Sequence, residues 1–280
     1  MGMNRRKKKV RRSSARDQGK IRGAIKPRAI GFALLGTAVI AAVIAWSPVG
    51  GALTGLTTGG SGSPSHRAAI IDQLGLTAPN AAFADDATAE LEQAGYSVDY
   101  YSAEQVTVDL YRGLPDHDYD LVLLRTHSTS VVSRGAEEVS SVALFTNEPY
   151  DETKYYEDQR AGRLGFASYT DGGELLFGIT ADFIENSMLG RFDDTLIVMM
   201  GCDGLKNERA AEAFIGKGAS SFISWDQFVT APHTDAATER LLEHLLRERL
   251  SPADAVRQTM LEVGPDKYYG AVLKAYPPAE

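Results

Sequence analysis

The chain has 280 residues, of which 44% are hydrophobic and 24% are charged, as is typical of a protein with a packed core. Its single cysteine excludes an internal disulfide and a zinc site built from several thiolates. Charge is unevenly distributed. Residues 1–28 carry twelve Lys or Arg and one acid, so the formal total of −8 leaves about −19 for residues 29–280.

Residues 29–47 are predicted to form a transmembrane helix. The run from Ala29 to Trp46 has no charged residue, and as a helix it would span roughly 27 Å, close to the thickness of the hydrocarbon core. The basic residues all precede it, so the positive-inside rule predicts a cytoplasmic tail over residues 1–28 and a signal anchor. A cleaved signal peptide and a buried core helix are the alternatives. A signal peptide would have an unusually long basic region and no clear A-x-A cleavage motif.

Residues 48–66 are rich in Gly, Ser, Thr and Pro, which predicts a flexible linker to a globular domain over residues 67–280. In that domain strand-like and helix-like segments alternate. The expected strands are 67–75, 97–103, 119–128, 141–150, 194–201 and 219–225. The expected helices are 80–96, 106–114, 180–189, 207–218, 234–250 and 251–264. This alternation predicts an α/β fold with a mainly parallel sheet that is covered on both faces.

Several helix ends are marked in the sequence. Thr180, Asn207 and Ser251 are expected N-caps, with Pro252 at the first position of the last helix. Gly95 is expected to stop the first helix. These signals set the boundaries of the expected elements.

Two residues with nucleophilic or acid–base chemistry directly follow buried strands. His127 comes just after "LVLL" and Cys202 just after "LIVMM". Ligands of parallel sheets bind beyond the carboxyl ends of the strands. If the two strands are neighbours, the imidazole can help form the thiolate and can protonate a leaving amine. The alternatives are an inert buried thiol and a histidine that only ends a strand.

Three segments occur in a characteristic order: "DYDLVLLRTHS" at Asp118–Ser128, "LIVMMGCDG" at Leu196–Gly204 and "AAEAFIGKGASSFISWDQFV" at Ala210–Val229. This order resembles the caspase-like (clan CD) cysteine peptidases, and within them the gingipain and CHAT-like branch. The resemblance covers about residues 117–262, with a weaker fit back to residue 67. It implies a caspase-like three-layer sandwich, a His–Cys dyad and hydrolysis of peptide bonds. No cofactor and no metal are expected.

The resemblance also implies roles for individual residues. Cys202 takes the place of the nucleophile and His127 that of the general acid and base. The backbone N–H groups of Ser128 and Cys202 take the place of the oxyanion hole. The family usually has Gly where this chain has Ser128, whose backbone is more restricted. Asp203 is interpreted as structural, because a carboxylate beside the thiol would oppose formation of the thiolate.

A substrate-binding role is implied for Trp225 and Asp226. In caspases a similar Ser–Trp pair is followed by Arg, which receives an acidic substrate side chain. Here Asp226 reverses the charge, so the resemblance implies selectivity for Arg or Lys before the cleaved bond. The alternative is a solvated aspartate in a loop.

Other chemistries fit the spacing less well. The residues after Cys202 do not have the spacing of a phosphatase loop, and "GKGAS" lacks the spacing of a nucleotide-binding loop. His233, Asp235 and His244 are not a compact zinc set. The sequence therefore predicts a hydrolase, a membrane-anchored cysteine protease with an extracytoplasmic catalytic domain. Its partners would be a polypeptide substrate and the membrane, with no nucleic acid. The alternative is a catalytically inactive caspase-like domain that serves as a surface binding or scaffold module, which the change to Ser128 favours.

Overall fold

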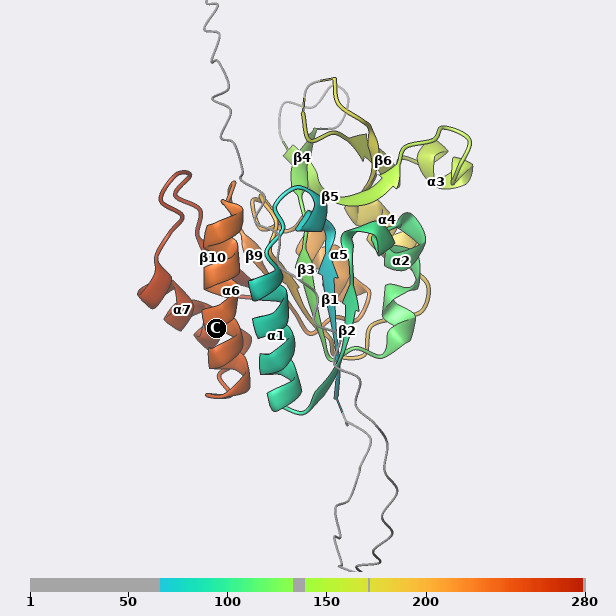
Figure 1. The fold of residues 1–280 in the computed structure, drawn as a ribbon. Helices are drawn as coiled ribbons and strands as arrows, with labels where there is room; N and C mark the ends of the chain where they lie inside the picture. The colour runs from blue at the N-terminus through green and yellow to red at the C-terminus, as the bar shows by residue number, and fades with distance from the viewer. Residues whose placement is uncertain (1–65, 133–138, 171, 279–280) are drawn as a thin grey trace, which may run out of the picture. The chain divides into compact units, whose positions relative to one another are not determined.

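Six strands form the larger sheet, in the order β10-β9-β8-β3-β1-β2 (Figure 1). The structure is a computed structural model that describes residues 66–132, 139–170 and 172–278. The strands are β1 (His66–Asp72), β2 (Tyr96–Tyr101), β3 (Leu121–Arg125), β8 (Leu196–Met199), β9 (Ser221–Trp225) and β10 (Leu273–Tyr276). Neighbours are parallel, except that β10 runs antiparallel to β9. The prediction of an α/β fold with a mainly parallel sheet is therefore confirmed.

One face of this sheet is covered by α1 (Ala81–Gln93), α6 (Ala231–Leu246) and α7 (Pro252–Val263), and α1 and α6 lie side by side on it (Figure 1). The core on this face includes Phe83 of α1 and Leu241 of α6. Leu121 and Leu123 of β3 point into the same core, whereas Val122 and Leu124 point into the core on the other face. Because both faces are covered, the central strands are continuous apolar runs rather than alternating ones.

The opposite face is covered by α2 (Val108–Gly113), α4 (Ala181–Asn186) and α5 (Arg209–Gly216), together with a second, antiparallel sheet. That sheet has the order β4-β5-β7-β6. Its strands are β4 (Ser128–Val132), β5 (Val139–Pro149), β6 (Leu164–Ala167) and β7 (Leu176–Ile179), and α3 (Tyr156–Arg160) lies between β5 and β6 in the chain. The second sheet thus belongs to the segment between β3 and β8, and it begins one residue after His127.

The predicted helix starts are confirmed at two positions and corrected at a third. Thr180 caps α4 by accepting a hydrogen bond from the backbone N–H of Phe183, and Ser251 caps α7 with Pro252 at its start. By contrast, α5 begins at Arg209 with Glu208 as its N-cap, one residue later than the expected cap at Asn207. The Asn207 side chain instead accepts a hydrogen bond from the backbone N–H of Arg209 at 3.2 Å.

Four strands and one α-helix of the described residues were not expected from the sequence: β4, β6, β7, β10 and α3. Each has only four or five residues. Their sequences lack an uninterrupted apolar run such as Leu196–Met199, which marks β8 as a strand although β8 also has only four residues.

The membrane-related predictions fall outside the described residues. These are the basic tail 1–28, the helix 29–47 and all of the linker 48–66 except its last residue. Within the described ranges, no helix is both long enough and apolar enough to cross a bilayer.

Candidate active site at the carboxyl edge of the sheet

His127 and Cys202 follow neighbouring parallel strands at the same distance from the last paired residues. In the register of β3 and β8, Leu124 lies opposite Met199, and the backbone N–H of Met200 donates to the carbonyl of Leu124 at 2.8 Å. His127 and Cys202 both come three residues after that last pair. The structure therefore brings both predicted residues to the carboxyl edge of the larger sheet, on adjacent strands.

His127 is held by contacts to its backbone, its ring nitrogen and its ring face. Its backbone N–H donates to Oε1 of Gln73 at 2.8 Å, and its Nε2 lies 2.8 Å from Oγ1 of Thr77. Its ring centroid lies 5.9 Å from that of Phe145 and 5.0 Å from that of Tyr169. Burial, and secondarily the positive charge of Arg125, lowers the pKa of His127 below its ordinary value. The imidazole is therefore neutral at neutral pH, as a general base must be.

The thiol of Cys202 is partly buried and lies against Val229. The backbone N–H of Val229 lies 3.5 Å from Sγ, and Sγ lies 3.7 Å from the Val229 carbonyl oxygen. Burial raises the pKa of the thiol. The contact with Val229 opposes this shift, and the charges of Asp203 and Asp266 add to it. No hydrogen bond joins Sγ to the His127 imidazole in the part of the chain that the structure describes. The resting pair is thus a thiol and a neutral imidazole, not a preformed ion pair.

The backbone N–H groups of Ser128 and Cys202 were expected at the oxyanion hole. The backbone N–H of Phe145 donates to the carbonyl of His127 at 2.9 Å, so these two residues form a hydrogen-bonded position of the antiparallel pair. Hydrogen-bonded and non-hydrogen-bonded positions alternate, which turns the N–H of Ser128 away from β5. Within the described residues, the N–H of Cys202 has no protein acceptor. Neither N–H group is therefore engaged by another described residue.

The side chain of Ser128 ties the two strand ends together. Its Oγ donates to the backbone carbonyl of Cys202 at 2.6 Å. Gly201, which precedes the cysteine, packs so closely here that an added Cβ would lie 2.5 Å from Oγ of Ser128 and 2.6 Å from the carbonyl oxygen of Thr126. The close approach of the strand ends therefore requires glycine at position 201.

Asp203 has the contacts of a structural residue. It is buried and adopts a left-handed backbone conformation with φ of 58°. Its Oδ2 accepts a hydrogen bond from Oγ of Ser130 at 2.5 Å and lies 3.4 Å from Nζ of Lys206. Its Oδ1 has no hydrogen-bond partner among the described residues. A buried carboxylate thus lies one residue from the thiol and opposes its ionisation.

The two residues expected to bind substrate lie in different environments. Trp225 is 1% exposed, and its indole N–H donates to Oγ1 of Thr234 at 2.9 Å. Because this side chain belongs to the core, we do not retain Trp225 as a substrate-contacting residue. Asp226 is at the edge, where Oδ1 accepts from the backbone N–H of Val272 and Oδ2 pairs with Nζ of Lys274, both at 2.9 Å. Its charge is therefore balanced by β10 in this structure.

Sequence reasoning missed the residues that hold His127, which are Gln73, Thr77 and Tyr169. It also missed a buried ion cluster beside them. Arg125 is 1% exposed and donates to Asp72 at 2.7 Å and to both carboxylate oxygens of Asp235 at 2.8 and 2.9 Å. One signal was present: a charged residue that ends an apolar strand must find a buried partner.

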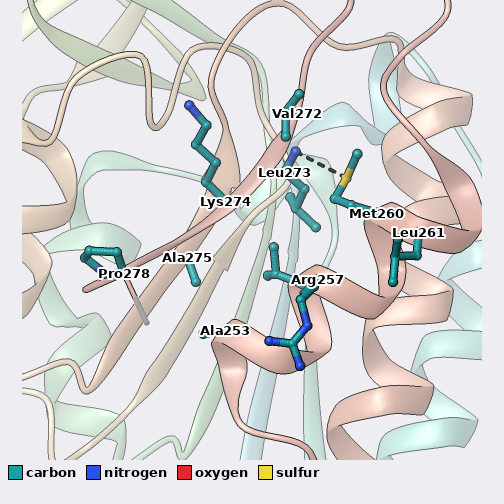
Figure 2. Close-up of a pocket in the computed structure, with 10 residues that line it drawn as sticks. Ala253, Arg257, Met260, Leu261, Val272, Leu273, Lys274, Ala275 and Pro278 are labelled. Atoms are coloured by element: carbon teal, nitrogen blue, oxygen red, sulfur yellow. Dashed lines mark hydrogen bonds between the residues drawn. The ribbon is translucent and has the colours of Figure 1, made fainter. Parts of the chain in front are cut away.

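Within the described residues, no group of three or more His, Cys, Asp or Glu side chains is arranged to hold a metal ion. A mostly apolar groove of about 520 Å³ lies between α7 and β10, where Met260 accepts a hydrogen bond from the backbone N–H of Leu273 (Figure 2). Neither His127 nor Cys202 lines this groove.

Comparison with protein-family models gives no match for this chain, and comparison with curated proteins gives no significant match. The chemistry of the chain therefore has to be inferred from the residues at the sheet edge.

Proposed function

We propose that this chain is a membrane-anchored cysteine endopeptidase with a caspase-like catalytic domain. One observation carries the proposal. His127 and Cys202, a base and a nucleophile, follow adjacent parallel strands in matching register at the edge where such sheets bind ligands. The backbone N–H groups of Ser128 and Cys202 add two donors beside them.

In the proposed reaction, Sγ of Cys202 attacks the carbonyl carbon of the scissile peptide bond while His127 takes the thiol proton. The carbonyl oxygen becomes an oxyanion that accepts hydrogen bonds from the two backbone N–H groups. His127 then gives the proton to the leaving amine, and the C–N bond breaks to leave a thioester. Water, deprotonated by His127, hydrolyses the thioester and restores the thiol.

The resting geometry requires one movement before this chemistry. Sγ lies against Val229 and is not hydrogen-bonded to His127, and its raised pKa keeps it protonated. We infer that the thiol rotates from Val229 towards His127 when substrate binds. Proton transfer would then accompany attack, because the low pKa of His127 does not favour a stable imidazolium.

Selectivity for Arg or Lys stays a prediction. It depends on Asp226, whose carboxylate now pairs with Lys274. A basic substrate side chain would have to replace that lysine as the partner of Asp226.

The second candidate is a catalytically inactive caspase-like domain that acts as a surface binding or scaffold module. Two observations favour it: the thiol has a raised pKa, and it has no hydrogen bond to His127 among the described contacts. Efficient cysteine nucleophiles usually have a lowered pKa.

The proposed topology places residues 1–28 in the cytoplasm and the catalytic domain outside. The support is the basic tail in front of an uncharged segment. Protease added to intact cells should then remove the globular domain. Digestion only after cell lysis would contradict this orientation.

The decisive experiment is incubation of the full-length chain, in detergent micelles, with a mixed peptide library, followed by mass analysis of the cleavage sites. The wild type should cleave, and Cys202→Ala and His127→Ala should not. Cleavage that persists in Cys202→Ala would refute the cysteine mechanism. A wild type that binds peptides without cleaving them would support the inactive domain.

A further inference from the structure

Tyr169 closes a ring of contacts around His127. It lies in the segment between β6 and β7, and its aromatic ring packs against the imidazole with centroids 5.0 Å apart. Its hydroxyl accepts a hydrogen bond from Nε2 of Gln73 at 2.5 Å. Oε1 of the same glutamine accepts from the backbone N–H of His127 at 2.8 Å. Gln73 therefore holds the histidine backbone with one end of its amide and the tyrosine with the other.

Gln73 is well suited to fix these groups. It is fully buried, directly after β1. Its Nε2 also donates to Oδ1 of Asn147 at 2.8 Å, and the Nδ2 of Asn147 donates to the backbone carbonyls of Gln73 and Ala103, both at 2.9 Å. The amides of Gln73 and Asn147 thus form a buried network joined to the backbone of three segments. Such a network is rigid because each member would lose a partner if it moved.

The tyrosine hydroxyl uses both its donor and its acceptor capacity in this network. It donates to Oδ1 of Asn147 at 2.5 Å and accepts from Gln73. The ring is thereby held against His127 and also against Phe145, with centroids 5.6 Å apart. Tyr169 is 39% exposed, so the outer part of the ring remains at the surface of the edge.

We propose that Tyr169 is a positioning residue for His127. Gln73 and Asn147 fix the tyrosine hydroxyl, and the tyrosine ring then holds the imidazole in the orientation in which Nε2 lies 2.8 Å from Oγ1 of Thr77. This inference rests on the proposed acid–base role of His127. Because Nε2 is engaged by Thr77, the other ring nitrogen remains for proton exchange with the thiol and the substrate. Tyr169 also shields the imidazole from water.

The test compares three variants of the full-length chain in detergent micelles. Tyr169→Phe keeps the ring and removes the hydroxyl. Tyr169→Leu removes the ring as well. Tyr150→Phe is the matched control, because the Tyr150 hydroxyl also donates one hydrogen bond, to Gln159 at 2.7 Å, but its ring packs on Phe166 and Phe177 rather than on His127.

Two measurements are made on each variant. One is the pH dependence of kcat and of kcat/KM for a peptide cleaved by the wild type. The other is the titration of the His127 ring protons by NMR, assigned by their loss in His127→Gln, since the chain has five histidines. The NMR titration does not require turnover.

We expect kcat to fall about three- to tenfold in Tyr169→Phe, the effect of hydrogen bonds worth about 1 kcal/mol, with KM little changed. A further fall is expected in Tyr169→Leu, so that the aromatic ring of the Phe variant partly rescues activity. In Tyr169→Leu the titration of His127 should move to higher pH, because burial is the main cause of its low pKa. Tyr150→Phe should leave both measurements unchanged.

The outcomes separate this inference from the proposed function. If the wild type has no peptidase activity but Tyr169→Leu still shifts the His127 titration, the positioning role stands and the peptidase proposal fails. If the wild type is active and Tyr169→Leu changes neither kcat nor the titration, the positioning role is overturned and the peptidase proposal survives. The positioning role would also be overturned if Tyr169→Phe and Tyr169→Leu lost the same thermal stability and neither changed the titration of His127.

Discussion

The hydroxyl of Ser128 donates to the backbone carbonyl of Cys202 at 2.6 Å, so the residue that follows His127 is hydrogen-bonded to the residue that carries the thiol. Where a glycine would leave this carbonyl without a side-chain donor, the serine fixes the relative position of the two strand ends. Ser128, which stands where the caspase-like family usually has glycine, thus supplies a hydrogen bond that glycine could not make.

Ser128→Ala should lower the free energy of unfolding by about 1 kcal/mol, because it leaves a partly buried carbonyl without its donor. Urea unfolding followed by tryptophan fluorescence measures this, with buried Trp225 as a reporter. Ser220→Ala is the control, since its hydroxyl also donates to a carbonyl, that of Asp194, but at an exposed site. If both substitutions lowered the free energy of unfolding equally, the Ser128 hydrogen bond would stabilise the fold no more than an exposed one does.

Gly201→Ala should be more damaging. The added methyl group would lie 2.6 Å from the carbonyl oxygen of Thr126, and a backbone atom cannot move aside as a flexible side chain can. Overpacking of this kind typically costs about 1–3 kcal/mol. Gly216→Ala is the matched control, because nothing lies within 4 Å of the position of its Cβ. Thermal unfolding of both variants tests this, and a Gly201→Ala protein as stable as Gly216→Ala would contradict the close packing of the strand ends.

The placement of His127 and Cys202 at one edge could be predicted from the sequence, but the groups that hold them could not. An apolar run such as Leu121–Leu124 marks a buried strand, and whatever follows it emerges at the carboxyl edge. Most contacts of His127 come from short segments far away in the chain. Thr77 is 50 residues from His127, and Gln73 is 96 residues from Tyr169. No periodicity links such positions, so only the fold reveals them.

The second sheet escaped prediction for a related reason. Its strand β5 contains the continuous apolar run Val142–Phe145 and was expected, whereas β6 and β7 are short and are interrupted by Gly165 and Gly178. Pairing between them depends on turns and on partners rather than on local pattern. The helix starts at Thr180 and Ser251 were predictable because a capping side chain acts within three residues of its own position.

Asp203→Asn should make Cys202 easier to ionise. The carboxylate of Asp203 helps to raise the thiol pKa, and removing its charge lowers that pKa, so more thiolate is present at neutral pH. Asparagine also tolerates the left-handed backbone at this position. The rate of alkylation by iodoacetamide, measured against pH by mass, is unambiguous because the chain has one cysteine.

The control for this substitution is Glu212→Gln, which removes one negative charge from the exposed side of α5. Its alkylation profile should match that of the wild type. Identical profiles for Asp203→Asn and the wild type would mean that burial alone sets the pKa of the thiol.

The stability of the domain should depend on the protonation of His127. Burial, and then Arg125, depresses its pKa in the folded state, so the unfolded chain binds the proton more readily. Stability from this group is therefore complete above the unfolded pKa of about 6.5 and is lost as the pH falls through the folded pKa. The slope cannot exceed about 1.4 kcal/mol per pH unit for a single proton.

Unfolding free energies of the wild type and His127→Gln at pH 7.5 and 5.5 provide the test. The stability of the wild type minus that of the variant should become smaller at the lower pH, because only the wild type has this group to protonate. A difference that grows on acidification would mean that the folded pKa is raised, and the buried, neutral histidine described here would be wrong.

The ion pair between Asp226 and Lys274 gives the sharpest test of substrate selectivity. If Asp226 receives Arg or Lys of the substrate, Lys274 competes for the same carboxylate at 2.9 Å. Lys274→Met should then raise kcat/KM for Arg peptides about threefold, since an ion pair whose lysine is half-exposed is worth about 1 kcal/mol or less. Asp226→Asn should lower it about tenfold and leave peptides with neutral residues unaffected. Lys154→Met is the matched control, because Lys154 pairs with Glu148 and is 54% exposed, against 52% for Lys274. The ratio of kcat/KM for Arg peptides to kcat/KM for neutral peptides is the quantity compared. If this ratio is the same in the wild type, Lys274→Met and Asp226→Asn, the selectivity determinant lies elsewhere on the edge.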